Sequence, residues 1–355
     1  MSPGDRGAGM GAAAASYAAG ATLPQDHIAA RDVAIVVPVG GDARWWGRSS
    51  RSLARLDPAP GQIVAVIDGH NDELAARAAA IGATVVRLAE RVGPAKARNR
   101  GAHTATREIL FFVDADVEVP VDLVSRVAAL FAEHPDMAAV IGSYDDAPSH
   151  PGVVSQYRNL LHHFVHQHGR EEASTFWAGC GAVRRAAFAE VGGFDEGYAE
   201  PSIEDIALGA RLVRAGHGIR LVASLQVKHL KRWRVSDMLA TDLWRRAVPW
   251  TVLMLRDGQI VNDLNVKVRD RSSVVAAFSL PAALAGAWRW PALAVAAAVA
   301  LILLVALNAR LFGFFVRKRG AWFAVRAVPL YWVYLVICGL GFALGMLRHL
   351  LGRSR

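Results

Sequence analysis

The stretch FFVDADVEVP at residues 111–120 decides the fold class of this chain. Phe111, Phe112 and Val113 form the apolar end of a strand, and Asp114 and Asp116 follow directly. Burying a carboxylate is costly unless a cation or hydrogen-bond donors meet it. Two carboxylates at this place therefore indicate either the point where a strand leaves the core or a site that holds positive charge.

Strands and helices alternate on the amino-terminal side of this stretch. The runs VAIVVPV (33–39), QIVAVIDG (62–69) and ATVVRL (83–88) predict strands, and NDELAARAAAIG (71–82) and GPAKARNRGAHTA (93–105) predict helices. Strands that are apolar without alternation are typical of a parallel sheet buried on both faces by helices. The sequence therefore predicts an α/β fold.

Acidic residues stand where two of these strands end, namely Asp68 after the second and the Asp114/Asp116 pair after the fourth. Ligands of open α/β sheets bind beyond the carboxyl ends of the strands. Farther along, PSIEDIALGARLVRAG (201–216) predicts a helix with Glu204 and Asp205 in its first turn. Free backbone N–H groups favour negative charge there, so helix-start acids without a chemical role remain an alternative.

The carboxyl-terminal part is far more apolar than the rest of this 355-residue, 53% hydrophobic chain. Residues 290–309 and 327–347 each reach the length of about 20 residues that a spanning helix needs. Residues 272–288 contain Pro281 and either pair with the second segment as a hairpin or lie in the interface. The sequence thus predicts two or three transmembrane helices.

The net charge of +9 does not indicate nucleic acid, because the basic residues gather beside the apolar segments. Lys and Arg next to membrane segments favour anionic lipid and the cytoplasmic side. With three spanning segments, the linker at 310–320 would lie in the headgroup layer with Arg317, Lys318 and Arg319 on the side of the catalytic domain. We therefore expect a cytoplasmic-membrane protein whose catalytic domain faces the cytoplasm.

Four parts are expected along the chain: a flexible tail (1–30), a catalytic domain (31–230), an interfacial segment (231–271) and a membrane region (272–355). The run RWRVSDMLATDLWRRAVPW (232–250) is rich in Arg and Trp, which predicts an interfacial helix. A continuation of the soluble core is the alternative.

An ordered series of motifs resembles the family 2 glycosyltransferases, which have the GT-A fold. The series is VVPV, VIDG, GPAKARNRGA, VDADV, GGFDE, IEDIALGARL and HLKRW, and it extends over residues 33–234. Each motif is weak by itself, and their order carries the resemblance. It implies a mixed, mostly parallel sheet and transfer of a sugar from a nucleotide-sugar donor, with inversion at the anomeric carbon.

The resemblance also implies a metal ion. A nucleoside diphosphate leaving group carries concentrated charge, which Mg²⁺ or Mn²⁺ held by carboxylate and diphosphate oxygens neutralises. Asp116 is the expected metal ligand, and Asp114 is expected to reach the metal, the ribose or the donor sugar. Asp68 resembles the aspartate that accepts from the base, and Pro38 the strand-end residue near the nucleotide. Two basic residues are expected over the donor, or on a solvated helix face: Lys96 and Arg98.

Inversion requires a base that deprotonates the acceptor hydroxyl. The resemblance assigns this role to Asp205, with Glu204 as a supporting or acceptor-orienting acid. Arg232 would neutralise the departing diphosphate and Trp233 would stack near the acceptor. His229 stands where the processive polysaccharide synthases of the family have Gln, and it would touch diphosphate or metal, unless it is structural.

Two or three spanning segments are too few to form a polymer channel in one chain. A single transfer to a membrane-held acceptor is therefore favoured, such as a polyprenyl phosphate, a lipid-linked saccharide or a glycolipid. The alternatives are a polysaccharide synthase that oligomerises and a catalytically silent membrane scaffold. A nucleotidyltransferase shares the sheet and the metal carboxylates but has no use for a late base followed by Arg-Trp.

Overall fold

The computed structural model describes residues 28–40, 43–258 and 268–352. Most of the expected tail (1–27) and residues 259–267 of the expected interfacial segment lie outside these ranges.

A mixed sheet of eight strands lies at the centre of the amino-terminal domain, in the order β3-β2-β1-β4-β7-β6-β8-β5. The first four strands run parallel to one another, as expected. Antiparallel pairing of β4 with β7, β7 with β6 and β8 with β5 makes the sheet mixed, whereas β6 and β8 are parallel. This confirms the expected fold class. The strands are β1 (Val33–Val39), β2 (Gln62–Ile67), β3 (Thr84–Arg87), β4 (Ile109–Val113), β5 (Val117–Glu118), β6 (Ala139–Tyr144), β7 (Cys180–Arg184) and β8 (Ile219–His229).

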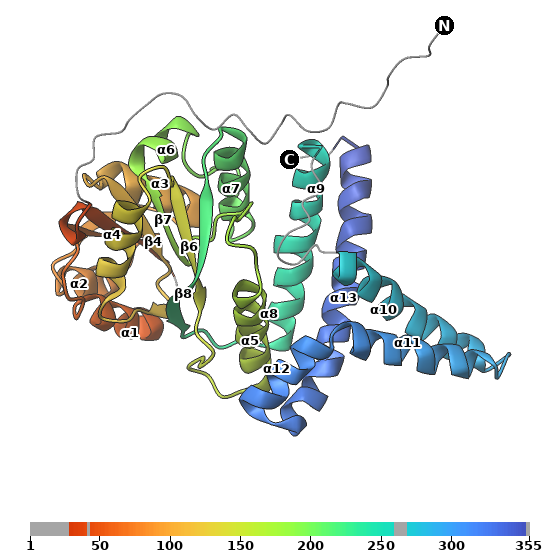
Figure 1. Cartoon of the computed structure of the whole chain (residues 1–355). Helices are drawn as coiled ribbons and strands as arrows, with labels where there is room; N and C mark the ends of the chain where they lie inside the picture. Colours follow the sequence, from red (N-terminus) through yellow and green to blue (C-terminus); the bar gives the residue numbers. More distant parts are fainter. Residues whose placement is uncertain (1–27, 41–42, 259–267, 353–355) are drawn as a thin grey trace, which may run out of the picture.

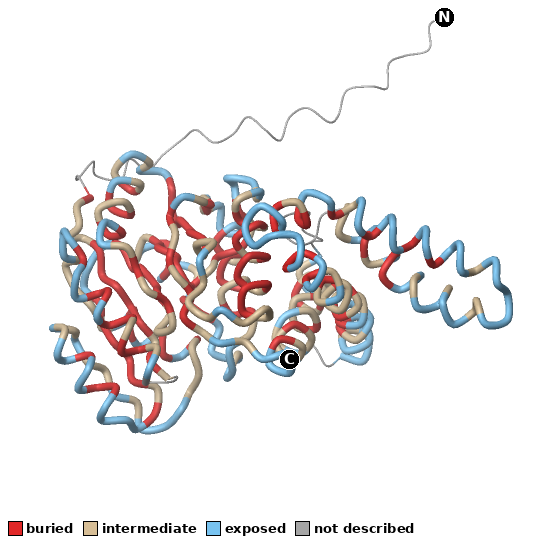
Figure 2. Tube along the Cα trace, turned by 90° about the horizontal axis from the view of Figure 1, so that it is seen from below, coloured by how far each residue is buried: buried red, intermediate tan, exposed pale blue. Residues whose placement is uncertain are grey.

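Helices cover both faces of this sheet, because successive side chains of a strand point to opposite faces. On β1, Val33, Ile35 and Val37 pack with α1, α2 and α4, whereas Ala34 and Val36 pack with α3, α6 and α7. Both faces are therefore buried, which explains the unbroken apolar strands (Figures 1 and 2). The helices are α1 (Ala43–Leu53), α2 (Asp72–Ala79), α3 (Pro94–Thr104), α4 (Leu123–Glu133), α5 (Val153–Gln167), α6 (Arg185–Glu190) and α7 (Glu204–Arg214).

A helical region follows the sheet. A continuous helix consists of α8 (Val235–Ala240), the π-helical turn η2 (Thr241–Ala247) and α9 (Val248–Arg256). After residues 259–267, which lie outside the described ranges, four more helices follow: α10 (Val268–Ala287), α11 (Leu293–Leu307), α12 (Ala309–Arg319) and α13 (Ala321–Leu350). In Figure 1, α10 and α11 form a hairpin that points away from the domain, and α13 lies beside α9.

Within the described ranges, α13 is the helix that is long and apolar enough to cross a membrane by itself. The segment expected at 290–309 is instead a helix of 15 residues, α11, which meets α12 at a bend of 67°. The bend lies at Asn308, whose buried amide donates to Ser273 Oγ and accepts from Tyr331 Oη, at 2.9 Å and 2.8 Å. A satisfied polar hub of this kind interrupts the apolar run.

The linker expected in the headgroup layer is helix α12, and two of its cations contact the catalytic domain instead. Lys318 pairs with Asp146 at 2.5 Å, and Arg319 Nε donates to Gln156 Oε1 at 2.7 Å. Both partners belong to the loop after β6 and the start of α5, so these polar contacts fix α12 to the catalytic domain.

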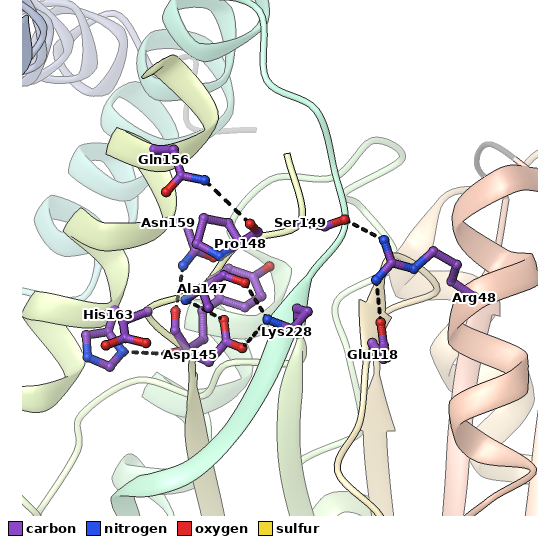
Figure 3. A network of polar contacts seen from close by, with 12 residues as sticks. Arg48, Glu118, Asp145, Ala147, Pro148, Ser149, Gln156, Asn159, His163 and Lys228 are labelled. Carbon is purple, nitrogen blue, oxygen red and sulfur yellow. Dashed lines mark hydrogen bonds and ion pairs between the residues drawn. The ribbon is translucent and has the colours of Figure 1, made fainter. Parts of the chain in front are cut away.

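The loop that follows β6 is held by a network of polar contacts from four elements (Figure 3). Lys228 of β8 pairs with Asp145 at 2.9 Å, and Asn159 of α5 donates to the Asp145 carbonyl at 2.6 Å. On the other side, Arg48 of α1 donates to Ser149 and pairs with Glu118 of β5 at 2.6 Å. The network fixes α5 relative to the ends of β5, β6 and β8, where the candidate site lies.

Candidate active site

The pairing of β5 with β8 brings Asp116 and His229 together although they are far apart in the sequence. Val117 lies opposite His229 in the antiparallel register, and the backbone N–H of Leu230 donates to the Asp116 carbonyl at 2.8 Å. His229 Nε2 is 3.8 Å from Asp116 Oδ2, and its ring stacks on Tyr144 with centroids 4.3 Å apart. Burial raises the pKa of the Asp116 carboxyl, but His229 and Lys231 outweigh this effect and lower it.

Arg98 lies between two of the candidate acids. Its guanidinium donates to Asp114 Oδ1 and to Glu204 Oε1, both at 2.8 Å, and its side chain is 6% exposed. Burial opposes the charge of Arg98, but the neighbouring carboxylates raise its pKa. We expected Arg98 to lie over the donor. In the structure its side chain is instead buried beneath Asp114 and Glu204 and fixes the positions of these two acids.

Glu204 is likewise turned inward. Oε1 accepts from Arg98, and Oε2 accepts from the backbone N–H of Ser202 at 2.8 Å. The side chain is 5% exposed. These contacts fit a supporting acid and leave no free oxygen that would orient an acceptor.

Asp205, one residue later on α7, faces the opposite way, into a cavity. Oδ2 accepts from the backbone N–H of Ala178 at 3.2 Å, and Oδ1 accepts from Ile206 N at 2.8 Å. Burial and the nearby charge of Glu204 raise its pKa to about 6. A base works best when its pKa lies near the operating pH. The two adjacent acids therefore differ in environment as a supporting and a reacting group would.

The cavity has a volume of about 540 Å³ and lies between the catalytic domain and the carboxyl-terminal helices. One wall is polar and carries Asp205, His229 and Trp233. The opposite wall comes from α13, with apolar residues such as Leu335 and Phe342, and from the start of α10, which adds Val274 and the charged residues Arg269, Asp270 and Arg271. The arrangement suits an elongated ligand with a polar reacting end and an apolar remainder.

Several cavity residues escaped the sequence analysis. On α5, Arg158 pairs with the buried Asp242 at 2.6 Å and lies over the Trp233 ring at 5.3 Å. The side chain of Arg246 in η2 lines the cavity and makes no hydrogen bond or ion pair with any residue that the structure describes. The sequence does show that α5 is rich in Arg and His and that η2 contains two adjacent arginines. Neither feature belongs to a motif of the series, so neither indicated a site.

An imidazole and aromatic cluster closes the cavity beside His229. The His162 ring lies 4.6 Å from Tyr144, 4.0 Å from His166 and 4.6 Å from Trp177, measured between centroids. Burial and the neighbouring His166 hold the pKa of His162 well below its usual value, so this ring is neutral. His162 thus contributes an uncharged ring to this side of the cavity.

Three residues expected at the nucleotide lie apart from the cavity. Pro38 is half-buried near the end of β1, opposite Val66. The Asp68 carboxylate accepts from the backbone N–H groups of Val92 and Gly93, at 2.7 Å and 3.1 Å, and so holds the loop before α3. Lys96 is exposed on α3 and makes no polar contact within the described ranges.

The last two residues of the HLKRW motif, Arg232 and Trp233, differ in placement. Trp233 is half-buried, its backbone N–H donates to Ser155 Oγ at 2.9 Å, and its buried indole Nε1 finds no partner in the described chain. Arg232 is exposed and does not line the cavity. The structure therefore brings Trp233, and not Arg232, to the candidate acceptor side.

A metal ion at this site would need ligands from outside the protein. No group of three or more His, Cys, Asp and Glu side chains in the described residues is arranged to hold one. Asp116 and His229 do fit as a pair, since their 3.8 Å separation is less than twice a metal–ligand distance of about 2.1 Å. Asp114 is occupied by Arg98, which fits a partner of the site better than a direct metal ligand.

Comparison with known families identifies the domain. Residues 34–192 match the model of glycosyl transferase family 2, and residues 158–234 match a model described as the N-terminal domain of galactosyltransferase. Residues 34–192 are therefore similar to the family 2 glycosyltransferases, and the GT-A sheet of the structure agrees with this match. Together the matched ranges extend over residues 34–234. They include the candidate site residues of the sheet edge and of α7, as well as Trp233.

Two similar proteins are informative about this glycosyltransferase. The pre-mycofactocin glycosyltransferase of Mycobacterium tuberculosis is 28% identical over 223 residues, which cover 59% of this chain and 45% of that protein. The chain thus spans less than half of that relative's length. The mannosyltransferase PcManGT of Pyrobaculum calidifontis, solved with GDP-Man and Mn²⁺, superposes with a TM-score of 0.54 at 16% identity, covering 91% of this chain and 88% of that one. At this identity the likeness shows the GT-A fold.

Proposed function

We propose that this glycosyltransferase moves a sugar, with inversion, from a nucleoside-diphosphate sugar to a hydroxyl group of a lipid-linked acceptor at the membrane. The observation that carries the proposal is the position of Asp205. Its carboxylate lines a cavity to which the apolar helix α13 also contributes, with residues such as Leu335 and Phe342.

The donor diphosphate binds beside Asp116 and His229. These side chains would hold Mg²⁺ or Mn²⁺ together with diphosphate oxygens, and the ion would neutralise charge that develops on the leaving group. Support comes from the 3.8 Å approach of the two side chains and from PcManGT, which was solved with GDP-Man and Mn²⁺. Asp114, fixed by Arg98, faces the same strand end and would position the ribose or the donor sugar.

Asp205 acts as the base. Its carboxylate takes the proton of the acceptor hydroxyl while the acceptor oxygen bonds to the anomeric carbon and the bond to the diphosphate breaks. Attack on the face opposite the leaving group gives inversion. Glu204 and Arg98 hold Asp205 in place from below through the start of α7.

The acceptor is inferred from the rest of the cavity. Arg246 offers a guanidinium without an ion pair in the described chain near Asp205, and α13 adds apolar side chains such as Leu335 and Phe342 to the same cavity. An Arg without a partner suits a phosphate. We place the phosphate that links the lipid to its glycan at Arg246, and the reacting hydroxyl at Asp205. A polyprenyl phosphate as the nucleophile fits less well, because it is already an anion and needs no base.

Location and alternatives follow from the same features. The apolar α13 and the exposed apolar helices favour attachment to the cytoplasmic membrane with the catalytic domain on the cytoplasmic side. A processive synthase would need a channel built by several copies of the chain. A silent scaffold has no physical need for an oriented Asp205 beside a paired Glu204.

The test is an incubation of the full chain in phospholipid vesicles with bacterial lipid extract, Mn²⁺ and single radiolabelled nucleotide sugars. We expect label in the organic phase with the wild type and none with Asp205→Asn. Label confined to a water-soluble polymer would support the processive alternative, and unchanged donor turnover in Asp205→Asn would contradict the assignment of the base. Pre-mycofactocin should be included as an acceptor because of the relative's name.

A further inference from the structure

Helix α13 meets the length and composition of a spanning segment, yet its contacts run along the side of the catalytic domain. A Cβ added at Gly341 would lie 2.2 Å from Ala247 Cβ, and one at Gly345 would lie 2.6 Å from Thr251 Cβ. These close approaches press α13 onto η2 and α9. Toward its other end, Tyr331 and Leu335 line the same cavity as Asp205.

Solvent-exposed ion pairs flank helix α9 at both ends. Before it, Arg245 pairs with Glu200 at 3.0 Å, and Glu200 is 73% exposed. At its end, Asp257 pairs with Arg214 of α7 at 2.6 Å, and Arg214 is 52% exposed. Exposed ion pairs belong in water, because charged side chains in hydrocarbon are costly. The half of α13 that packs on α9 therefore lies beside hydrated parts of the catalytic domain.

The hairpin of α10 and α11 has the opposite character. It projects from the body of the molecule (Figure 1), and Figure 2 shows most of its length exposed. Large apolar side chains are exposed along both helices, among them Val275 (67%), Leu284 (58%), Val295 (68%) and Ile302 (65%). A helix that is apolar all round is buried in a protein core or in a membrane, and within the described chain no other element covers these side chains.

Charge and aromatic residues mark the two ends of this hairpin. Its tip carries Trp288, Arg289 and Trp290, with Trp288 96% exposed and the Arg289 guanidinium over the Trp290 ring at 5.6 Å. Its base carries Arg271 and Arg310. Trp and Arg are enriched where helices meet lipid headgroups. The uncharged residues 272–287 of α10 between these ends correspond to about 24 Å, most of the thickness of the hydrocarbon layer of about 30 Å.

We propose that the α10–α11 hairpin is the element that enters the bilayer, and that α13 lies in the membrane interface, parallel to the surface and against the catalytic domain. The partner is the phospholipid bilayer, with its anionic headgroups at the basic base of the hairpin. This inference rests on the proposed membrane location and not on the proposed chemistry. It also places the side of the cavity that α10 and α13 line next to the lipid.

Depth-dependent quenching tests the arrangement. An environment-sensitive fluorophore is attached to cysteines introduced singly at Ile302 in the hairpin and at Val325, Leu340 and Leu347 along α13. The background is Cys338→Ala, and Cys180 stays because it is buried in the sheet. The full chain is placed in vesicles of phosphatidylcholine and phosphatidylglycerol with quenchers at the headgroup or deep in the acyl chains. We expect the deep quencher to act most on Ile302, and the headgroup quencher to act most on all three α13 positions. Deep quenching at Leu340 with shallow quenching at Val325 would show that α13 spans and would overturn the proposal.

Two Lys substitutions provide a second test. Val295→Lys/Ile302→Lys places charges on exposed hairpin positions, so the catalytic domain keeps its packing. We expect vesicle flotation to decrease about 10–100-fold, while donor hydrolysis in detergent stays unchanged. Val213→Lys, at a position of α7 that is 42% exposed, is the matched control and should float like the wild type. Unchanged flotation of the hairpin variant would contradict insertion. So would a variant that still binds vesicles but no longer associates with other copies of the chain.

Discussion

The guanidinium of Arg98 donates to Glu204 at 2.8 Å, and both side chains are almost completely buried. This contact ties α3 to the start of α7, and the second arm of the same guanidinium reaches Asp114 at the end of β4. The donor edge of the sheet and the helix that carries the candidate base are therefore fixed relative to each other by one side chain.

Removal of Arg98 should destabilise the protein. Arg98→Ala leaves Asp114 and Glu204 without their buried cation, and the loss of one partner from a buried pair costs about 3–5 kcal/mol of unfolding free energy. Denaturant unfolding measures the change. Arg100→Ala, an exposed neighbour on α3, is the control and should change stability by less than about 0.5 kcal/mol. Equal effects of the two variants would show that the bridge contributes nothing.

The transfer rate should fall as the pH falls through about 6. Burial and Glu204 raise the pKa of Asp205 to about 6, and a base acts when it is deprotonated. A profile of kcat/KM between pH 5 and pH 8 should therefore show an acid limb near 6. A rate that is flat through this range would contradict the role of Asp205.

The same raised pKa predicts a stability signature. A carboxyl whose folded pKa of about 6 exceeds the ordinary value of 3.8 binds its proton more tightly in the folded state. Its stabilising contribution is present below pH 4 and is lost as the pH rises through 6. Asp205→Asn should therefore be at least as stable as the wild type at pH 8 in thermal unfolding, although it is inactive. A marked loss of stability at pH 8 would indicate a structural role.

Donor binding should depend on Asp116 together with a divalent ion. We expect UDP-sugars or GDP-sugars to raise the melting temperature of the wild type in the presence of Mn²⁺, and to have little effect on Asp116→Asn. Asp122→Asn, an exposed acid at the start of α4, is the control and should respond like the wild type. A full Mn²⁺-dependent shift in Asp116→Asn would move the metal site elsewhere.

Arg246 should act on the acceptor alone. Arg246→Gln removes a cavity cation that has no polar partner in the described chain, so stability and donor hydrolysis should stay within error. The KM for the lipid-linked acceptor should rise about 10–150-fold, as expected for the loss of a hydrogen bond to a charged group worth about 1.5–3 kcal/mol. Arg234→Gln, exposed outside the cavity, is the control. An unchanged KM would place the acceptor phosphate elsewhere.

Much of the fold followed from local sequence patterns. The four amino-terminal strands and the helices at 71–82, 93–105 and 201–216 were expected from apolar runs, capping residues and glycines, and the structure confirms them. Antiparallel β7 and the long strand β8 were not expected, because their pairing joins residues distant in the chain. Likewise, the run at 290–309 reads as one span, and only the buried Asn308–Ser273–Tyr331 contacts reveal its break.

By itself, the sequence determined the chemistry available to this protein: carboxylates at strand ends, an acid pair at a helix start and apolar segments after the domain. The tertiary structure alone decided which side chains meet. It turned Glu204 inward to Arg98 and Asp205 outward to the cavity, set His229 beside Asp116, and laid α13 against the domain. The physical reason is that side-chain type and local periodicity are written along the chain, whereas register, burial and ion pairing arise between segments that the sequence places far apart.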